Sequence, residues 1–246
     1  MSIDYDHKIN PHRNDDGAIV VPVLFGDGVP NSLLDVGCGT GTWAKAVRDN
    51  GVEDTLGIDG NALSPTAFIS QSDFRLVDFT RSWDLGRRFD MALCLEVAEH
   101  LDEQYADLLV ECLTRHADKI VFSAACPGQG GQHHVNCQWP EYWQQRFNTF
   151  GYVCVDSIRP KIWTDHQIAP WYRQNMFVAT HAPEHAGSEP RIQSLLHPEI
   201  FGLTQHCSSI QGYQDLIESG TLPWTWYASV PFKAFWSKMK RRISSK

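Results

Sequence analysis

The stretch that decides the fold runs Leu33-Leu34-Asp35-Val36-Gly37-Cys38-Gly39-Thr40-Gly41-Thr42-Trp43. Its apolar first part predicts a buried strand, and the three glycines that follow predict a tight turn that opens a helix. Glycine allows the backbone to approach a ligand closely at the carboxyl end of a strand. The spacing is G-x-G-x-G, and Thr42 stands where the dinucleotide fingerprint G-x-G-x-x-G has its third glycine. This difference disfavours an NAD or FAD site.

Outward from this turn, short apolar runs alternate with helical patterns between Ser32 and about Thr180. The alternation predicts an α/β fold, in which a mostly parallel sheet of βαβ units is covered by helices. The predicted strands are Ser32–Val36, Thr55–Ile58, Phe74–Val77, Phe89–Leu95, Lys119–Ser123, Tyr152–Val155 and Asn175–Ala179. We therefore predict one α/β domain over residues 1–180, with a loop-rich lead-in to about Pro30, and a C-terminal appendage over residues 181–246.

Polar side chains follow three of these strands at the points where the strands end. Asp59 and Gly60 follow the second strand, and a carboxylate there can accept hydrogen bonds from both hydroxyls of a ribose. Asp78-Phe79 follows the third strand, where an acid can accept from an exocyclic amino group while an aromatic ring flanks a base. The fourth strand runs through Leu95 into Glu96-Val97-Ala98-Glu99-His100. We expect these groups to converge at one edge of the sheet.

With these motifs the sequence resembles the class I methyltransferases that use S-adenosylmethionine. The resemblance rests on Asp35 through Gly41, Asp59, Asp78-Phe79 and the run from Phe89 to His100, and it covers roughly residues 32–180. It implies a Rossmann-like sheet of seven strands whose final strand, Asn175–Ala179, is antiparallel. It also implies that the protein is an enzyme and that S-adenosylmethionine is its cofactor.

The resemblance further implies which residues bind the cofactor. Gly37, Gly39 and Gly41 would border its methionine part, Asp59 its ribose, and Asp78-Phe79 its adenine. The complete predicted set is Asp35, Gly37, Cys38, Gly39, Gly41, Asp59, Gly60, Asp78, Phe79, Leu95 and Glu96. Two other interpretations stay open at this point: a non-catalytic module that holds S-adenosylmethionine as a regulatory ligand, and an NAD(P)-dependent oxidoreductase of the Rossmann type.

The loop from Cys126 to Trp139 contains three glycines and two adjacent histidines after the fifth strand. Methyl transfer to a hydroxyl requires removal of a proton, and histidine titrates near neutral pH, so we predict His134, and after it His133, as the general base. The alternative is that one histidine caps backbone groups and the other is solvated. A zinc site made by this pair with Cys126 and Cys137 has no standard spacing, so the sequence predicts no metal.

Residues for the methyl acceptor are predicted with less detail. Glu99 and His100 would lie close to the cofactor and the substrate, or else cap a helix that starts at about Asp102. Seven of the nine tryptophans lie at or beyond Trp139, and aromatic faces beside polar groups are typical of sites for sugars and other polar rings. The further candidate substrate residues are Asn136, Trp139 and Arg173, with Gln138 and Arg159 nearby. We therefore expect a small-molecule or saccharide acceptor that is methylated on oxygen, as in glycan or natural-product biosynthesis.

Composition excludes several other classes of protein. The 246 residues are 42% hydrophobic and 20% charged, which is typical of a globular domain with a core. The net charge of −8 disfavours a nucleic-acid partner, because DNA and RNA binding requires a basic surface. The seven cysteines include no C-x-x-C pair, and the N-terminus has neither a basic nor an apolar signal region, so we expect a cytoplasmic protein.

The C-terminal end has the opposite charge from the rest of the chain. Its last fourteen residues hold six basic side chains and no acidic one. Phe232, Phe235, Trp236 and Met239 fall on one helical face, which predicts a basic amphipathic helix over residues 232–242. Such a helix would either dock on the acidic domain or make a peripheral contact with an anionic membrane.

Overall fold

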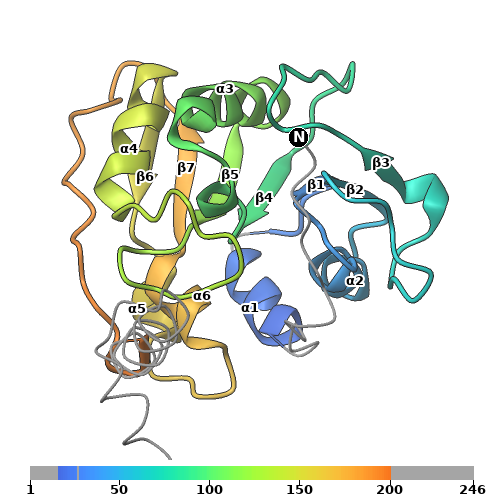
Figure 1. Cartoon of the computed structure of the whole chain (residues 1–246), viewed down its shortest axis with the longest axis horizontal. Helices are drawn as coiled ribbons and strands as arrows, with labels where there is room; N and C mark the ends of the chain where they lie inside the picture. The colour runs from blue at the N-terminus through green and yellow to red at the C-terminus, as the bar shows by residue number, and fades with distance from the viewer. Residues whose placement is uncertain (1–15, 27, 201–246) are drawn as a thin grey trace, which may run out of the picture. The chain divides into compact units, whose positions relative to one another are not determined.

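A single seven-stranded sheet forms the centre of the computed structural model, which describes residues 16–26 and 28–200 (Figure 1). The strand order is β3-β2-β1-β4-β5-β7-β6. The strands are β1 Ser32–Val36, β2 Asp54–Asp59, β3 Phe74–Leu76, β4 Met91–Leu95, β5 Lys119–Ser123, β6 Tyr152–Val155 and β7 Phe177–His181. Strands β3, β2, β1, β4 and β5 pair in parallel, whereas β7 is antiparallel to both β5 and β6. The predicted α/β fold with an antiparallel last strand is confirmed.

The register of the parallel strands brings their carboxyl ends to one edge of the sheet. Val36 at the end of β1 lies beside Ile58 of β2 and Cys94 of β4, and Leu95 lies beside Ser123 of β5. The loops that follow β1, β2, β4 and β5 therefore leave from neighbouring points. Ligands of open α/β sheets bind at this edge.

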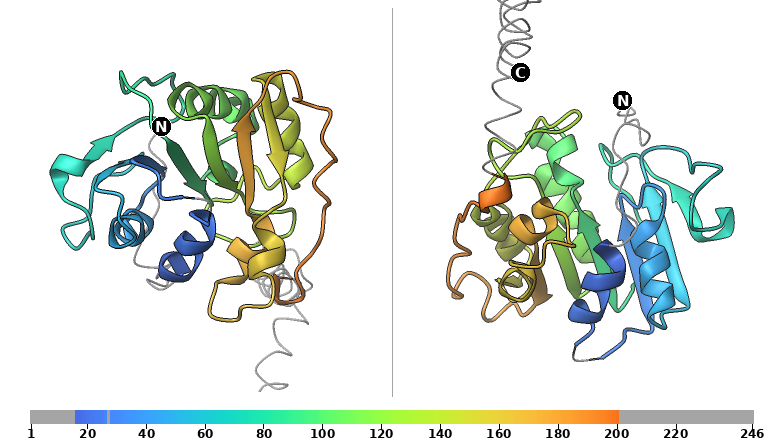
Figure 2. Two further views of the ribbon diagram at one scale, coloured as in Figure 1. Left: turned by 180° about the vertical axis from the view of Figure 1, so that it is seen from behind. Right: turned by 90° about the horizontal axis from the view of Figure 1, so that it is seen from below.

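Helices cover both faces of the sheet because the strand residues alternate in direction. Leu33, Leu93 and Val121 pack on one face with helices α1 Asp16–Leu24 and α2 Thr42–Asp49, and the short helices α5 Arg159–Ile162 and α6 Pro170–Asn175 complete this layer. Leu34 and Phe122 point to the other face, toward α3 Ala106–His116 and α4 Pro140–Thr149. Figure 2 shows the two helical layers from other directions. Every central strand is thus apolar on both sides.

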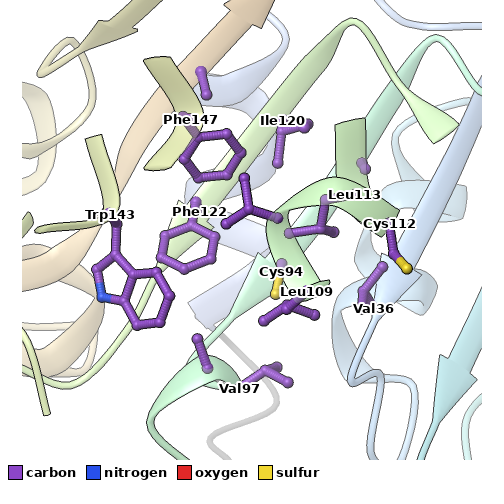
Figure 3. Packing of buried hydrophobic residues seen from close by; sticks show 14 of the residues in the cluster. Val36, Cys94, Val97, Leu109, Cys112, Leu113, Ile120, Phe122, Trp143 and Phe147 are labelled. Atoms are coloured by element: carbon purple, nitrogen blue, oxygen red, sulfur yellow. The ribbon is translucent and has the colours of Figure 1, made fainter. Parts of the chain in front are cut away.

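Aromatic rings fill the core beneath α4. The ring of Phe122 lies 5.1 Å from that of Trp143 and 5.4 Å from that of Phe147, measured between ring centroids (Figure 3). Trp143 is 1% exposed, so this side chain is part of the core rather than of a ligand site. The close packing fixes the position of α4 and of the loop that precedes it.

The structure corrects several boundaries, and β2 Asp54–Asp59 and β3 Phe74–Leu76 differ from the predicted strands by only one residue at an end. Residues 16–24, which the sequence analysis assigned to a loop-rich lead-in, form α1, because Val20, Val21 and Leu24 bury against Trp43 and Val47 of α2. Strand β4 starts at Met91 rather than Phe89. Strand β7 starts at Phe177 rather than Asn175, since α6 extends through Asn175.

The chain does not leave the domain at residue 180. Ile192 is 4% exposed and belongs to the core cluster on the α3 and α4 side. Glu189 accepts hydrogen bonds from the side chains of Gln144 and Asn148 and from the N–H of Cys154. Burial therefore continues along residues 182–200.

The predicted C-terminal amphipathic helix over residues 232–242 lies outside the described residues, and so does most of the predicted appendage. Within residues 16–26 and 28–200, no helix is both long enough and apolar enough to cross a membrane.

Candidate active site at the carboxyl edge of the sheet

A cavity of about 810 Å³ opens at the carboxyl ends of the parallel strands. It is lined by the turn after β1, the ends of β2 and β4, the segment after β3, the loop after β5 and helix α6. Its lining residues are Gly37, Cys38, Gly39, Thr42, Trp43, Asp59, Gly60, Asn61, Leu76, Val77, Asp78, Phe79, Thr80, Leu95, Glu96, Val97, Glu99, His100, Leu101, Gln129, Gly130, Gly131, His134, Trp171 and Tyr172. A volume of this size accommodates a ligand larger than a single nucleoside.

The glycine turn forms one wall of the cavity. The N–H groups of Gly37 and Cys38 both donate to the carbonyl of Ile58, at 2.8 and 3.0 Å, which bends the chain sharply at the end of β1. Gly37 has φ 73°, and a Cβ added there would lie 2.3 Å from Cγ2 of Val97. Only glycine meets both conditions without strain, so the turn brings bare backbone to the cavity.

Asp59 is joined to this turn by a hydrogen bond. Its Oδ2 accepts from the N–H of Gly39 at 2.9 Å, and its Oδ1 accepts from the N–H of Asn61 at 2.8 Å. The side chain is 8% exposed and lies in the cavity wall. A carboxylate has about four acceptor positions, and these two bonds use two of them. The remaining lone pairs suit the two hydroxyls of a ribose, so the residues present fit an adenosyl cofactor.

Asp78 and Phe79 lie in the same wall, after β3. Phe79 is 7% exposed and packs in the core, while its edge reaches the cavity. Asp78 accepts hydrogen bonds from the hydroxyl of Thr80 at 2.6 Å and from its N–H at 3.0 Å. These bonds hold the pKa of the Asp78 carboxyl below its ordinary value, because they favour the charged form. An ionised acceptor thus stands beside an aromatic ring.

Glu96 directly follows β4 in an unusual backbone conformation, with φ 55°. Its carboxylate accepts from Nε2 of Gln129 at 2.8 Å and from Nδ2 of Asn175 at 3.1 Å. Burial raises the pKa of the Glu96 carboxyl, and these two amide donors oppose the rise. Side chains from the loop after β5 and from α6 therefore meet at the end of β4.

Glu99, His100 and His134 form a compact cluster next to Glu96. One ligating atom from each of the three side chains lies within 4.8 Å of the others. Glu99 is 0% exposed, and neither of its carboxylate oxygens has a hydrogen-bond partner of ordinary geometry within the described residues. Burial, and next the neighbouring Glu96 charge, raise the pKa of the Glu99 carboxyl well above its ordinary value.

The two histidines of the cluster are neutral at neutral pH. Burial, followed by repulsion from His134, lowers the pKa of His100 from its ordinary value to about 4. Burial also lowers the pKa of His134, and the carbonyl of Gln129 opposes that change. The imidazole rings of the pair meet edge to face, with centroids 5.0 Å apart. Both rings thus offer a nitrogen lone pair.

The structure brings most of the predicted cofactor residues into the cavity wall. Those that line it are Gly37, Cys38, Gly39, Asp59, Gly60, Asp78, Phe79, Leu95 and Glu96. Gly41 lies behind the wall, where a Cβ would lie 2.8 Å from Ile69. Asp35 is also behind it, 3% exposed, and burial raises the pKa of its carboxyl to about 7. Neither of these two residues is among those that line the cavity.

Only some of the predicted substrate and catalytic residues line the cavity. Glu99, His100 and His134 line the cavity, whereas His133 is exposed and has φ 56°. Asn136 and Trp139 are not in the cavity wall: the N–H of Asn136 donates to the carbonyl of Glu99, and Trp139 directly precedes α4.

Arg173 is a correction to the predicted acceptor pocket. It is 0% exposed, and its guanidinium donates to the carbonyls of Ile168 and Trp163 and to the carboxylate of Glu199. Arg159 is likewise turned inward, toward Asp156. A buried guanidinium must have its N–H groups satisfied, and in both cases neighbouring loops supply the acceptors.

Sequence reasoning missed the aromatic wall that α6 adds to the cavity. Tyr172 accepts a hydrogen bond from Nε1 of Trp43 at 3.1 Å, and the two rings meet edge to face at 5.0 Å. Trp171 lies beside them in the cavity lining. The tryptophan content of this part of the chain was the only sequence signal, and it did not distinguish Trp171 from the rest.

A family comparison decides the class to which this site belongs. Residues 13–177 match the family model described as a methyltransferase domain. The chain belongs to the methyltransferase domain family. It is an S-adenosylmethionine-dependent methyltransferase. The glycine turn, the acid after β2 and the strand order β3-β2-β1-β4-β5 are features that it shares with Rossmann folds, whereas the antiparallel β7 between β5 and β6 is not.

Solved structures resemble this methyltransferase in fold. The sugar N-methyltransferase KedS8 from a Streptoalloteichus species matches with a TM-score of 0.54 and 17% identity, over 72% of this chain and 91% of that one. Magnesium protoporphyrin IX methyltransferase from Synechocystis, with bound SAH, matches with a TM-score of 0.52 and 17% identity, over 70% and 84% of the two chains. The DhpI-SAH complex matches with a TM-score of 0.51 and 14% identity, over 74% and 92%.

No curated protein matches the methyltransferase by sequence. At these identities the solved structures establish its fold and leave the methyl acceptor to be argued from the site.

Proposed function

We propose that the protein transfers a methyl group from S-adenosylmethionine to a hydroxyl oxygen of a small polar acceptor, such as a sugar or glycan hydroxyl. The observation that carries the proposal is the continuity of the cavity. It extends from the glycine turn and Asp59 to the Glu99–His100–His134 cluster. A cofactor cradle and a cluster of proton-accepting groups thus share one cavity.

Each cofactor residue is assigned to the part of S-adenosylmethionine that its chemistry suits. Asp59 accepts from the ribose hydroxyls with the lone pairs that Gly39 and Asn61 leave open. Asp78 accepts from the exocyclic amino group of adenine, and Phe79 flanks the base. The backbone at Gly37 and Gly39 borders the methionine part, with Cys38, Gly60, Leu95 and Glu96 around it.

Asp35 and Gly41 act indirectly in this proposal. Neither lines the cavity: Asp35 is buried in β1, and the N–H of Gly41 closes the turn on the carbonyl of Cys38, so both shape the backbone of the turn without contact with the cofactor.

When bound, S-adenosylmethionine supplies a methyl group that an acceptor oxygen attacks in line, and S-adenosylhomocysteine leaves as the carbon–sulfur bond breaks. The protein must then align the acceptor and take up the hydroxyl proton. His134 is neutral at pH 7 and lies in the cavity wall, so it is the general base of the proposal. His133, predicted as the second choice, is exposed and outside the wall, and it is not retained.

The side chains around the acceptor end of the cavity support a polar acceptor. Trp171 and Tyr172 offer aromatic faces, and Glu99 and His100 offer polar groups, an arrangement that suits a ring with hydroxyls. KedS8 is named as a sugar N-methyltransferase, so amino sugars are the closest competing acceptors. The cytoplasmic location and the absence of a nucleic-acid partner stay predictions.

An acceptor screen tests this proposal. The full chain would be incubated with methyl-labelled S-adenosylmethionine and a panel of sugars, nucleotide sugars, oligosaccharides, amino sugars and a short RNA. We expect label on a hydroxyl oxygen and release of the demethylated cofactor in equal amount. Transfer only to amino groups, or only to an unrelated small molecule, would reject the acceptor class. Tight cofactor binding with no transfer to any acceptor would favour the non-catalytic interpretation.

A further inference from the structure

Three side chains of the cavity wall have the arrangement of a metal-binding set. Glu99 and His100 are adjacent in sequence after β4, and His134 comes from the loop after β5. Their ligating atoms lie within 4.8 Å of one another. An ion with ligand distances of about 2.0–2.2 Å keeps its donor atoms at most about 4.4 Å apart. Shifts of a few tenths of an ångström would therefore bring the three atoms to one centre.

The orientation of the imidazole rings supports this arrangement. Nδ1 of His100 lies 3.3 Å from the carbonyl oxygen of His133, and Nδ1 of His134 lies 3.1 Å from that of Gln129. A neutral histidine that donates through Nδ1 carries its lone pair on Nε2. Metal-ligating histidines almost always donate their other ring N–H to a carbonyl or a carboxylate in this manner.

Glu99 provides an independent observation. Its side chain is 0% exposed, and neither carboxylate oxygen has a hydrogen-bond partner of ordinary geometry within the described residues. The Glu96 carboxyl is a close neighbour and adds a second acidic group to the same buried site. A buried carboxylate with no well-formed hydrogen bond is costly, and a bound cation removes the cost. Among the described residues that line the cavity, none is a lysine or an arginine that could supply that charge.

The site is held in place by the backbone. The N–H groups of Val135 and Asn136 donate to the carbonyl of Glu99 at 2.9 and 3.1 Å, so the loop with His134 is tied to the residue that it faces. The N–H of Gln138 donates to the carbonyl of Ala125 and closes the loop at its other end. The three ligands are therefore positioned before any ion binds.

We propose that Glu99, His100 and His134 bind one divalent transition-metal ion whose open coordination positions face the acceptor end of the cavity. Two imidazoles and one carboxylate suit Zn²⁺, Fe²⁺, Co²⁺ or Mn²⁺, whereas Mg²⁺ and Ca²⁺ prefer oxygen ligands alone. The set differs from the Cys126, His133, His134 and Cys137 group considered in the sequence analysis. His134 is the only member common to both.

The inference rests on the proposed function for the position of the acceptor, and it changes the part that His134 plays. An ion held by these three residues would lower the pKa of a hydroxyl bound to it, so that the proton could leave to solvent as the oxygen reacts. That oxygen then forms the bond to the methyl carbon while the carbon–sulfur bond breaks. His134 is in this case a ligand and not the base, and Glu96 adds negative charge beside the site.

Metal binding can be measured without an acceptor. The full chain, stripped with EDTA and dialysed, would be titrated with Co²⁺ and with Mn²⁺, followed by visible absorption and by loss of the free Mn²⁺ resonance signal. We expect one ion per chain. We expect Glu99→Gln and His134→Ala to weaken binding by about 10- to 100-fold or more, because even the outer partners of metal ligands are worth that much.

His133→Asn is the matched control, because it removes the neighbouring histidine from the same loop, and asparagine tolerates the left-handed backbone found there. We expect its metal affinity to match the wild type within about twofold. Binding of S-adenosylhomocysteine by every variant verifies that the variant is folded. A wild-type chain that takes up no ion, or one whose affinity survives both Glu99→Gln and His134→Ala, would overturn the proposal.

The acceptor screen separates this inference from the proposed function. Full methyl transfer in EDTA by a metal-free chain would reject a metal ion in the reaction and would support O-methylation. One ion bound at Glu99 and His134 without transfer to any hydroxyl would support the metal site and reject O-methylation.

Discussion

Replacement of Asp59 by asparagine tests the cofactor cradle at a single atom. In the structure Oδ2 accepts from the N–H of Gly39 and Oδ1 accepts from the N–H of Asn61. Asparagine keeps the shape of the side chain but exchanges one of these oxygens for an NH₂ group. That group cannot accept from the backbone, so one backbone donor loses its partner and the ribose loses a charged acceptor.

The size of the effect follows from these contacts. A hydrogen bond to a charged group contributes about 1.5–3 kcal/mol. At about 1.4 kcal/mol for each factor of ten, loss of one such bond weakens cofactor binding by about 10- to 150-fold. Because the side chain is only 8% exposed, water does not replace the lost acceptor.

Isothermal titration calorimetry with S-adenosylmethionine and S-adenosylhomocysteine measures this change, with NADH as the comparison ligand. Asp54→Asn is the matched control, since Asp54 is at the opposite end of the same strand and pairs with Arg87 at the surface. We expect the control to bind as the wild type does. An Asp59→Asn variant that is folded and binds both adenosyl ligands within twofold of the wild type would refute the ribose assignment.

Three further substitutions test the surroundings of the site. Burial raises the pKa of Asp35 from 3.8 to about 7, so the native state binds more protons than the unfolded state between these values, and the free energy of unfolding should fall by up to about 4 kcal/mol as pH rises from 4 to 7. Urea unfolding should show a flatter pH dependence for Asp35→Asn than for the wild type, and parallel curves would contradict the assignment. Gly37→Ala places a Cβ 2.3 Å from Val97 at φ 73°, and we expect it to lower the melting temperature and to weaken cofactor binding at least tenfold; unchanged calorimetry would count against the close approach. Gly131→Ala places a Cβ 2.1 Å from Nε2 of His134, so methyl transfer should fall at least tenfold while cofactor affinity stays within about threefold, and equal losses of both would show that the loop acts on the cofactor instead.

The strands and the cofactor edge were predictable because they depend on local chemistry. Strands β1, β5 and β6 have the predicted bounds, since continuous apolar runs between turn residues are typical of buried strands. Asp59 and Asp78 could be placed near the glycine turn because parallel strands bring their carboxyl ends to one edge.

Side chains that meet through packing could not be placed from the pattern. Asn175 reaches Glu96 although 79 positions separate them, and Tyr172 reaches Trp43 across 129. Arg173 was predicted in the acceptor pocket because it is polar and near tryptophans in sequence. Its guanidinium is turned inward, since Glu199 and two carbonyls accept its hydrogen bonds.

The sequence by itself therefore determined the α/β class, the glycine turn and the acids that follow β2 and β3. These features depend on the spacing of apolar residues and on where each strand ends, and both can be read from consecutive residues. Only the tertiary structure decided that Glu99 and His100 face His134 and that His133 does not. The physical reason is that the loop after β5 has no periodic pattern. Its direction comes from hydrogen bonds to the carbonyl of Ala125, at its own start, and to the carbonyl of Glu99, which lies in another part of the chain.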